Sequence, residues 1–180
     1  MKKIIIFRHG DYNHNSGQLD VESAMEIFAR TKTIRQQTGC AAVIYASPIL
    51  RCQQTAQVIA LAMDNAKIET EGLLAESFHD AQYQCKNKLI ELAKNQDSDT
   101  IAVVTHYPNI KLMFNASLRP GMEITFEAEN WQQIFDKAGS NFISRTPGFS
   151  EELFERYFAP ECEEGDAEKL QTLDFLKGRL

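Results

Sequence analysis

The apolar residues of this sequence gather in short continuous runs, separated by stretches in which they recur every three or four positions. Two runs rich in β-branched residues lie at positions 4–7 and 101–104, and a third apolar run lies at 41–46. Consecutive apolar residues are typical of strands buried on both faces of a parallel sheet. Residues Lys67–Thr70 predict a weaker fourth strand.

The intervals between these runs have the spacing of helices. Apolar residues at helical spacing predict one helix over residues 21–34 and a second over 50–62. Ser47 and Pro48 predict the start of the second helix, with a serine cap and proline at the first helical position. A third helix is expected from about residue 81 to 95, and Pro108 is placed to open a fourth.

The alternation of strands and helices predicts an α/β fold, a doubly wound three-layer αβα sandwich with a mostly parallel central sheet. After Asn115 the pattern changes to one short strand at 122–126 and two helices at 149–158 and 167–176. We expect a single domain over residues 1–180, with an edge strand and a helical tail at 116–180 packed on the core.

Charge and composition narrow the class of protein. The net charge of −6 excludes a general nucleic-acid binder, whose footprint would be basic. Residues 149–180 hold 4 basic and 9 acidic side chains, a balance of −5, so most of the excess acid lies in the tail. A partner-binding role and a solvated face are both open for this tail.

The same sequence predicts a cytoplasmic protein that does not bind membranes. The N-terminal apolar run stops after four residues, too short for a signal peptide, and no stretch approaches the length of a membrane span. The four cysteines have no metal-ligand spacing, and we expect them to be reduced and mostly buried.

Unusual polar residues follow several of the predicted strands. Arg8 and His9 follow the first strand, Arg51 lies shortly after the second, Glu76 after the weak third and His106 directly after the fourth. In an open parallel sheet, ligands bind outside the carboxyl ends of the strands. We therefore expect these five side chains to meet at one edge of the sheet.

The chemistry of this set indicates an anion site. The planar fork of arginine binds phosphate or carboxylate through two hydrogen bonds, and histidine serves as nucleophile, general base or cation. A helix beginning at Pro48 would add free backbone N–H groups. The sequence has neither a carboxylate cluster suited to magnesium nor zinc-ligand spacing, so no metal or other cofactor is expected.

Three segments resemble the histidine phosphatase superfamily, the phosphoglycerate-mutase-like proteins. They read FRHGD at residues 7–11, ASPILRCQQTA at 46–56 and VTHYP at 104–108. The resemblance covers about residues 1–115, and the short form is most similar to the small SixA-type phosphohistidine phosphatases. It implies an enzyme that hydrolyses a phosphoester or phosphohistidine without a metal ion, on a phosphorylated small molecule or a phosphohistidine protein.

The resemblance also implies roles for individual residues. His9 matches the histidine that attacks phosphorus and becomes phosphohistidine, and Arg8, Arg51 and His106 match the residues that hold the phosphoryl group. Glu76 matches the acid that protonates the leaving group. Asn15 matches a polar position that lines the site in some members.

The sequence departs from the family pattern in two places. Cys52 stands where a small residue such as alanine is usual, and the residues after Glu76 do not follow the mutase pattern. His79 and Asp80 are therefore alternatives to Glu76 as the general acid. A phospholigand-binding sensor or scaffold without turnover, and a mutase, are the alternative functions.

Four other residues near the motifs are interpreted as structural or surface residues, or in one case left open. His14 and His79 are expected on the surface, and Ser47 is interpreted as a helix cap. Tyr107 either lines the mouth of the pocket or packs.

Overall fold

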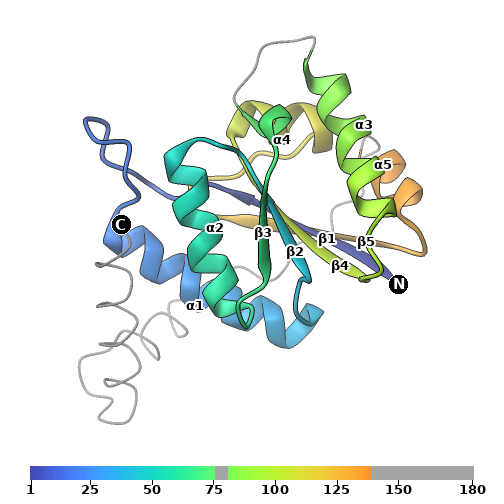
Figure 1. Ribbon diagram of the computed structural model, residues 1–180, viewed down its shortest axis with the longest axis horizontal. Coiled ribbons are helices and arrows are strands. Elements are labelled where there is room, and N and C mark those ends of the chain that lie inside the picture. The colour runs from blue at the N-terminus through green and yellow to red at the C-terminus, as the bar shows by residue number, and fades with distance from the viewer. Residues whose placement is uncertain (76–80, 139–180) are drawn as a thin grey trace.

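The computed structural model describes residues 1–75 and 81–138. A five-stranded sheet in the order β3-β2-β4-β1-β5 forms its centre (Figure 1). Its strands are β1 (Lys2–Arg8), β2 (Val43–Ala46), β3 (Lys67–Thr70), β4 (Thr100–Thr105) and β5 (Glu123–Ala128). All neighbours pair in parallel except β1 and β5, which are antiparallel.

Helices cover both faces of this sheet. They are α1 (Val21–Thr38), α2 (Leu50–Ala62), α3 (Ala81–Lys94), α4 (Tyr107–Phe114) and α5 (Trp131–Ala138), with the short 3-10 helix η1 (Gly72–Leu74). Helices α1 and α2 lie on one face, and α3, α4 and α5 lie on the other (Figure 1). The expected three-layer α/β sandwich is thus confirmed.

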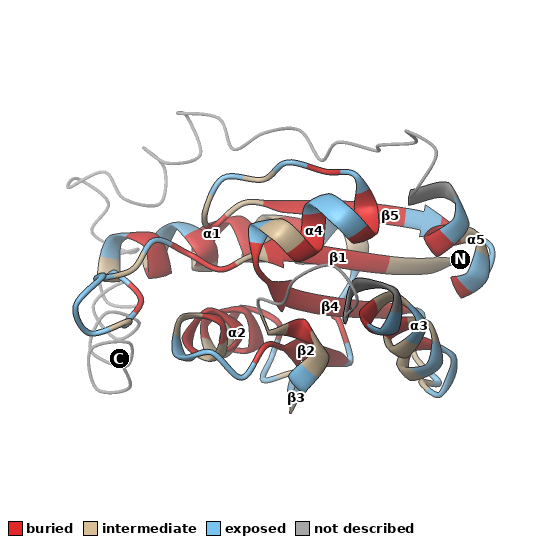
Figure 2. Ribbon diagram, turned by 90° about the horizontal axis from the view of Figure 1, so that it is seen from above, coloured by how far each residue is buried: buried red, intermediate tan, exposed pale blue. Residues whose placement is uncertain are grey.

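The strand β1 shows how consecutive apolar residues divide between two cores. Ile4 and Ile6 pack into the cluster that includes α3, α4 and α5, while Ile5 and Phe7 pack into the cluster under α1 and α2. Successive side chains of a strand point to opposite faces, so a strand covered on both sides needs apolar residues at every position. The middle of each central strand is accordingly buried, and the exposed residues lie in the loops and on the outer surfaces of the helices (Figure 2).

The four strands and four helices expected up to residue 115 are present, with shifted ends. The start of α2 is one correction, because the helix begins at Leu50 and Ile49 is its N-cap. Pro48 therefore precedes the helix, and Ser47 is not the cap. Of the three described cysteines, Cys52 and Cys85 are buried as expected and Cys40 is exposed, and none of the three is in a disulfide.

Helix α5 was not expected from the sequence. Trp131, Ile134 and Phe135 bury one side of it against the core, at the i, i+3, i+4 spacing of an amphipathic helix. The predicted tail helices at 149–158 and 167–176, and Cys162, lie outside the described residues. The extent of the single domain therefore remains an expectation.

One buried ion pair joins α1 to β5. Arg30 Nε and Nη2 donate to the two carboxylate oxygens of Glu123 at 2.9 and 2.7 Å. The side chains are only 9% and 3% exposed, respectively. This bidentate contact fixes the antiparallel edge strand against the helix layer.

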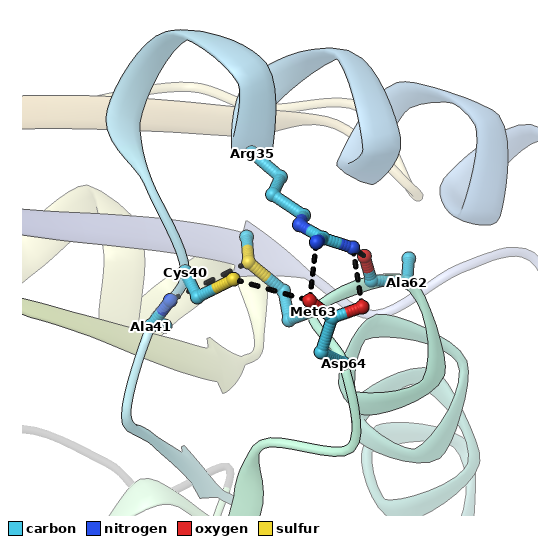
Figure 3. A network of polar contacts seen from close by, with 6 residues as sticks. All are labelled: Arg35, Cys40, Ala41, Ala62, Met63 and Asp64. Carbon is cyan, nitrogen blue, oxygen red and sulfur yellow. Dashed lines mark hydrogen bonds and ion pairs between the residues drawn. The ribbon is translucent and has the colours of Figure 1, made fainter.

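A second polar network ties the end of α1 to the turn after α2, away from the carboxyl ends of the parallel strands (Figure 3). Arg35 donates to the Ala62 carbonyl and forms an ion pair with Asp64. The thiol of Cys40 lies 3.8 Å from the same carboxylate. Asp64 has a φ of 57°, so these contacts hold a backbone conformation that L residues rarely adopt.

Within the part of the chain that the structure describes, no helix combines the length and apolar character needed to cross a membrane.

Candidate active site

The carboxyl ends of β1, β2 and β4 meet at the same level of the sheet. Arg8 is in register with Thr105, and Ala46 with Val104, so the next residues along each chain leave the sheet together. A cavity of about 320 Å³ opens there. It is lined by Arg8, His9, Asp11, Tyr12, His14, Arg51, His106, Tyr107, Pro108 and Pro120.

Backbone hydrogen bonds on both sides fix His9 at the centre of this edge. Its N–H donates to the Thr105 carbonyl at 3.1 Å, and its carbonyl accepts from the Gly121 N–H at 3.0 Å. The ring nitrogen Nδ1 lies 2.8 Å from the Gly10 carbonyl oxygen. A carbonyl can only accept, so Nδ1 carries the proton and the lone pair of the neutral ring is on Nε2.

Gly10 is required by the close packing behind His9. A Cβ at this position would lie 2.5 Å from Leu19 Cδ1 and Ser23 Oγ and 2.8 Å from Ile27 Cδ1. The Gly10 N–H donates to Thr55 Oγ1 at 3.1 Å, and that hydroxyl in turn donates to the Arg51 carbonyl at 2.7 Å. The loop after β1 is thereby joined to the first turn of α2.

Arg51 lies between the two histidines of the site. Its Nε donates to His9 Nε2 at 3.2 Å, and its Nη2 contacts His106 Nδ1 at 3.3 Å. The ring of Tyr12 lies against the guanidinium, with 4.6 Å between the ring centroid and Cζ. One cation is therefore held by both imidazoles and an aromatic face.

His106 has the opposite tautomer to His9. Guanidinium nitrogens only donate, so the Nδ1 that faces Arg51 must be bare and Nε2 must carry the proton. That Nε2–H lies 3.0 Å from Ser47 Oγ and 3.5 Å from Cys52 Sγ. The buried hydroxyl of Ser47 is thus the nearer acceptor.

Arg8 supplies the second cation. Its Nη1 donates to the Leu118 carbonyl at 2.9 Å, and its Cζ lies 5.5 Å from the ring centroid of Tyr107. Its Nε is buried and has no hydrogen-bond partner among the described residues. The guanidinium group also lines the cavity, where its charge suits an anionic ligand.

The electrostatics keep both histidines neutral. Burial lowers the pKa of His9 from 6.5 to about 4; the Gly10 hydrogen bond opposes this, and the positive charges of Arg51 and Arg8 add to it. Burial, with His9, Arg51 and Arg8, lowers the pKa of His106 to about 3. A neutral imidazole has a lone pair available at neutral pH, which a nucleophile requires.

The structure brings together four of the residues that the sequence singled out: Arg8, His9, Arg51 and His106. Asn15 is not brought to the cavity. It is exposed, and its backbone N–H donates to the Asn13 side chain at 2.8 Å in a surface turn.

Glu76, His79 and Asp80 lie outside the described residues. The backbone just before position 76 is nevertheless tied to α4, which follows His106. Asn109 Nδ2 donates to the carbonyls of Leu74 at 2.9 Å and Ala75 at 3.0 Å. Asn109 thus anchors the backbone just before position 76 to the first turn of α4.

Sequence reasoning missed three contributors to the site. Tyr12 packs on Arg51, His14 lies against Tyr12 with ring centroids 4.8 Å apart, and Ser47 contacts His106. His14 is exposed as expected, yet it lines the cavity. The place of Tyr12 two residues after the RHG motif is the sequence feature that could have identified it as a site residue.

The described residues offer no group of three His, Cys, Asp or Glu side chains arranged to hold a metal ion. Their chemistry is that of an anion site: two guanidinium groups beside a neutral imidazole lone pair. Such an arrangement can bind a phosphoryl group and attack it in line.

Comparison with protein-family models and with curated proteins finds no match. Among solved structures, the protein histidine phosphatase SixA complexed with tungstate is similar, with a TM-score of 0.61 and 16% identity over 69% of this chain and 87% of that one. A mycobacterial glucosyl-3-phosphoglycerate phosphatase complexed with VO3 has a TM-score of 0.56 and 11% identity, covering 71% and 93%.

The phosphoglycerate mutase of Plasmodium falciparum is also similar, with a TM-score of 0.52 and 19% identity over 72% of this chain and 87% of that one. The similarity spans most of each of these chains and agrees with the fold expected from the three motifs. The chain has the fold of the histidine phosphatase superfamily, which SixA phosphohistidine phosphatases and phosphoglycerate-mutase-like proteins share.

Proposed function

We propose that this protein is a metal-independent phosphatase that works through a covalent phosphohistidine on His9. The observation that carries the proposal is the neutral His9 ring, whose Nε2 lone pair lies in the cavity beside Arg51. The positive charge of Arg8, which lines the same cavity, supports an anionic ligand there.

In the first step, the phosphoryl group enters with its oxygens toward Arg8, Arg51 and His106. Arg51 turns its N–H donors from the imidazoles to these oxygens, which frees His9 Nε2. That lone pair forms a bond to phosphorus while the bond from phosphorus to the leaving group breaks. The guanidinium groups stabilise the charge on the equatorial oxygens as the loose transition state forms.

The Gly10 carbonyl has a direct part in this step. Attack through Nε2 leaves a positive charge on the imidazole, and the Nδ1–H then donates more strongly to the carbonyl 2.8 Å away. The same contact keeps the proton off Nε2 before the attack. His9 is therefore oriented and held in the reactive tautomer by its own neighbour.

In the second step, water attacks phosphorus, the bond to Nε2 breaks, and inorganic phosphate leaves. The leaving group needs a proton in the first step, and the attacking water must lose one in the second. We propose Glu76 for both transfers, with His79 and Asp80 as alternatives. Asn109 supports this assignment, since it anchors the Ala75 carbonyl immediately before Glu76.

The substrate is proposed to be a phosphoester or a phosphohistidine. Solved structures with this fold include a protein histidine phosphatase and a sugar phosphoglycerate phosphatase, which fits both classes. We propose a cytoplasmic setting for the reaction, in keeping with the absence of a disulfide at Cys40, Cys52 and Cys85.

A panel of substrates tests the proposal. It compares a phosphohistidine protein, sugar phosphates, nucleotides, phosphoglycerates and p-nitrophenyl phosphate, with wild-type protein and His9→Ala. We expect turnover of at least one of them by the wild type, and a loss of about 10³-fold or more in kcat for His9→Ala. Full activity of His9→Ala would contradict the proposal.

The alternative is a sensor that binds a phosphorylated ligand without hydrolysis. The hydrogen bond from Arg51 to His9 Nε2 favours it, because this contact occupies the lone pair of the nucleophile. Tight phosphate-ester binding without release of phosphate across the panel would support the sensor. Phosphoryl transfer within one phosphoglycerate, without net release, would indicate a mutase instead.

A further inference from the structure

Ser47 contacts Nε2 of His106, whereas Arg51 contacts Nδ1 on the other side of the ring. The reaction proposed above gives Ser47 no role. It follows β2, where its N–H donates to the Val104 carbonyl at 3.0 Å. The residue is completely buried, and its Oγ lies 3.0 Å from His106 Nε2. Two different strand ends therefore hold the hydroxyl and the imidazole together.

The contacts fix the direction of this hydrogen bond in the ligand-free protein. Arg51 Nη2 donates to His106 Nδ1, so the ring proton is on Nε2 and Ser47 Oγ accepts it. The same oxygen also accepts from the Ile49 N–H at 3.3 Å. A serine hydroxyl has two acceptor sites and one donor, so the hydroxyl proton remains free to be donated.

The tautomer of His106 with the proton on Nε2 cannot donate a hydrogen bond to a phosphoryl group. Once Arg51 turns to the phosphoryl oxygens, the lone pair of Nδ1 would face the lone pair of an anionic oxygen and repel it. A proton on Nδ1 converts this repulsion into a hydrogen bond. His106 can gain it either as a second proton or by moving the existing one from Nε2.

We propose that Ser47 is a positioning residue whose hydroxyl lets His106 exchange tautomers when a phosphoryl group binds. A proton leaves Nε2 to solvent and another reaches Nδ1, so the charge of the ring does not change. Ser47 then rotates its hydroxyl and donates to the bare Nε2. The inference rests on the proposed phosphoryl site and adds a residue and a proton position to it.

The surroundings favour exchange over a second proton. In the ligand-free protein, burial together with His9, Arg51 and Arg8 lowers the pKa of His106 to about 3, so the ring is neutral before the phosphoryl group binds. Cys52 is the other neighbour of Nε2, but its sulfur is 3.5 Å away and is a weak hydrogen-bond partner. Only the serine hydroxyl can both accept from and donate to this nitrogen effectively.

The test is long-range ¹H–¹⁵N correlation spectroscopy of histidine-labelled full-length protein, with and without tungstate, an oxyanion that remains a dianion at neutral pH. In the free protein we expect His106 to be protonated at Nε2 alone. With tungstate we expect protonation at Nδ1 alone. Protonation of both nitrogens, or no change at His106 in the complex, would overturn the exchange.

Substitutions at Ser47, Cys52 and Ser98 distinguish a positioning role of Ser47 from a role in folding alone. Ser47→Ala should weaken tungstate binding about tenfold and abolish the exchange, and Ser47→Thr, which keeps the hydroxyl, should restore part of both. Cys52→Ala should leave the exchange intact. Ser98→Ala removes a hydroxyl bonded to Thr100 at the opposite end of β4 and should leave binding unchanged.

The outcomes also separate this inference from the proposed function. Absence of tungstate binding in the wild type would contradict the phosphoryl site itself. Binding with normal turnover but an unchanged His106 tautomer would contradict only the role of Ser47. Equal tungstate affinity of Ser47→Ala and wild type would contradict it as well.

Discussion

The rings of His9 and His106 meet edge to face with their centroids 5.2 Å apart, and Arg51 contacts one nitrogen of each. The remaining nitrogens have different partners, a carbonyl for His9 and a serine hydroxyl for His106. The two rings consequently carry their protons on different nitrogens. In the mechanism proposed above, His9 attacks through Nε2 while His106 contacts the phosphoryl oxygens.

The bridging position of Arg51 predicts a large effect for a conservative change. Arg51→Lys keeps the charge but cannot contact both rings or hold two phosphoryl oxygens in one plane. We expect kcat/KM for p-nitrophenyl phosphate to fall by about 10²- to 10³-fold, with little change in the melting temperature. Arg35→Lys, which alters the Asp64 contact away from the cavity, is the matched control and should retain activity.

The lowered pKa of His9 sets the acid limit of activity. The imidazole of His9 must be neutral before Nε2 can attack. Activity should therefore fall as the pH drops through the pKa that His9 has in the folded protein. Since burial lowers that pKa to about 4, kcat/KM should hold down to about pH 5 once the ionisation of the substrate is corrected for. An acid limb of the corrected profile near 6.5, the ordinary value, would contradict the burial of a neutral His9.

The packing behind Gly10 predicts that one added methyl group damages both stability and activity. Gly10→Ala places a Cβ against Leu19, Ser23 and Ile27 and moves the carbonyl that orients His9. We expect a loss of about 1–3 kcal/mol in the free energy of unfolding, measured by urea denaturation, together with lower kcat.

Gly72 provides the control for this substitution. A Cβ there meets nothing within 4 Å, and its φ is not in the left-handed region. Gly72→Ala should therefore change the free energy of unfolding by less than about 0.5 kcal/mol. Similar losses for the two alanine variants would argue against close packing as the cause.

The ion pair between Arg30 and Glu123 predicts strong non-additivity. Arg30→Met leaves a buried carboxylate without its partner, which should lower the free energy of unfolding by about 3–5 kcal/mol. Adding Glu123→Leu removes that carboxylate and should restore most of the loss. Denaturant unfolding of both single variants and the double variant measures the coupling, and additive losses would contradict it.

The sequence predicted the sheet well because its central strands each hold a run of consecutive apolar residues. It also placed Arg8, His9, Arg51 and His106 at one edge, since each is at or near the end of a parallel strand. Helix α5 was not predicted because it is short and only three large apolar residues mark its buried side. Three apolar residues at helical spacing predict a helix only when the surface against which they pack is known.

Other features depend on contacts between distant segments. Ser47 has the residue type of a helix cap, but α2 begins three residues later, and the contact of Ser47 with His106 joins residues 59 positions apart. Asn15 has the polar character of a site residue, but the turn stabilised by Asn13 keeps it at the surface. The pairing of Arg30 with Glu123 joins residues 93 positions apart, which no local pattern indicates.

The most direct test of the account is to trap the covalent intermediate. Protein mixed with p-nitrophenyl phosphate is quenched in base within milliseconds, digested and analysed by mass spectrometry, with the bonded nitrogen assigned by ³¹P and ¹⁵N spectroscopy. We predict one acid-labile, base-stable phosphoryl group on Nε2 of His9, formed and lost at rates that account for turnover. Ready turnover with phosphate trapped on another residue would contradict the account. So would turnover with no trapped phosphate under conditions in which hydrolysis of the intermediate limits the rate.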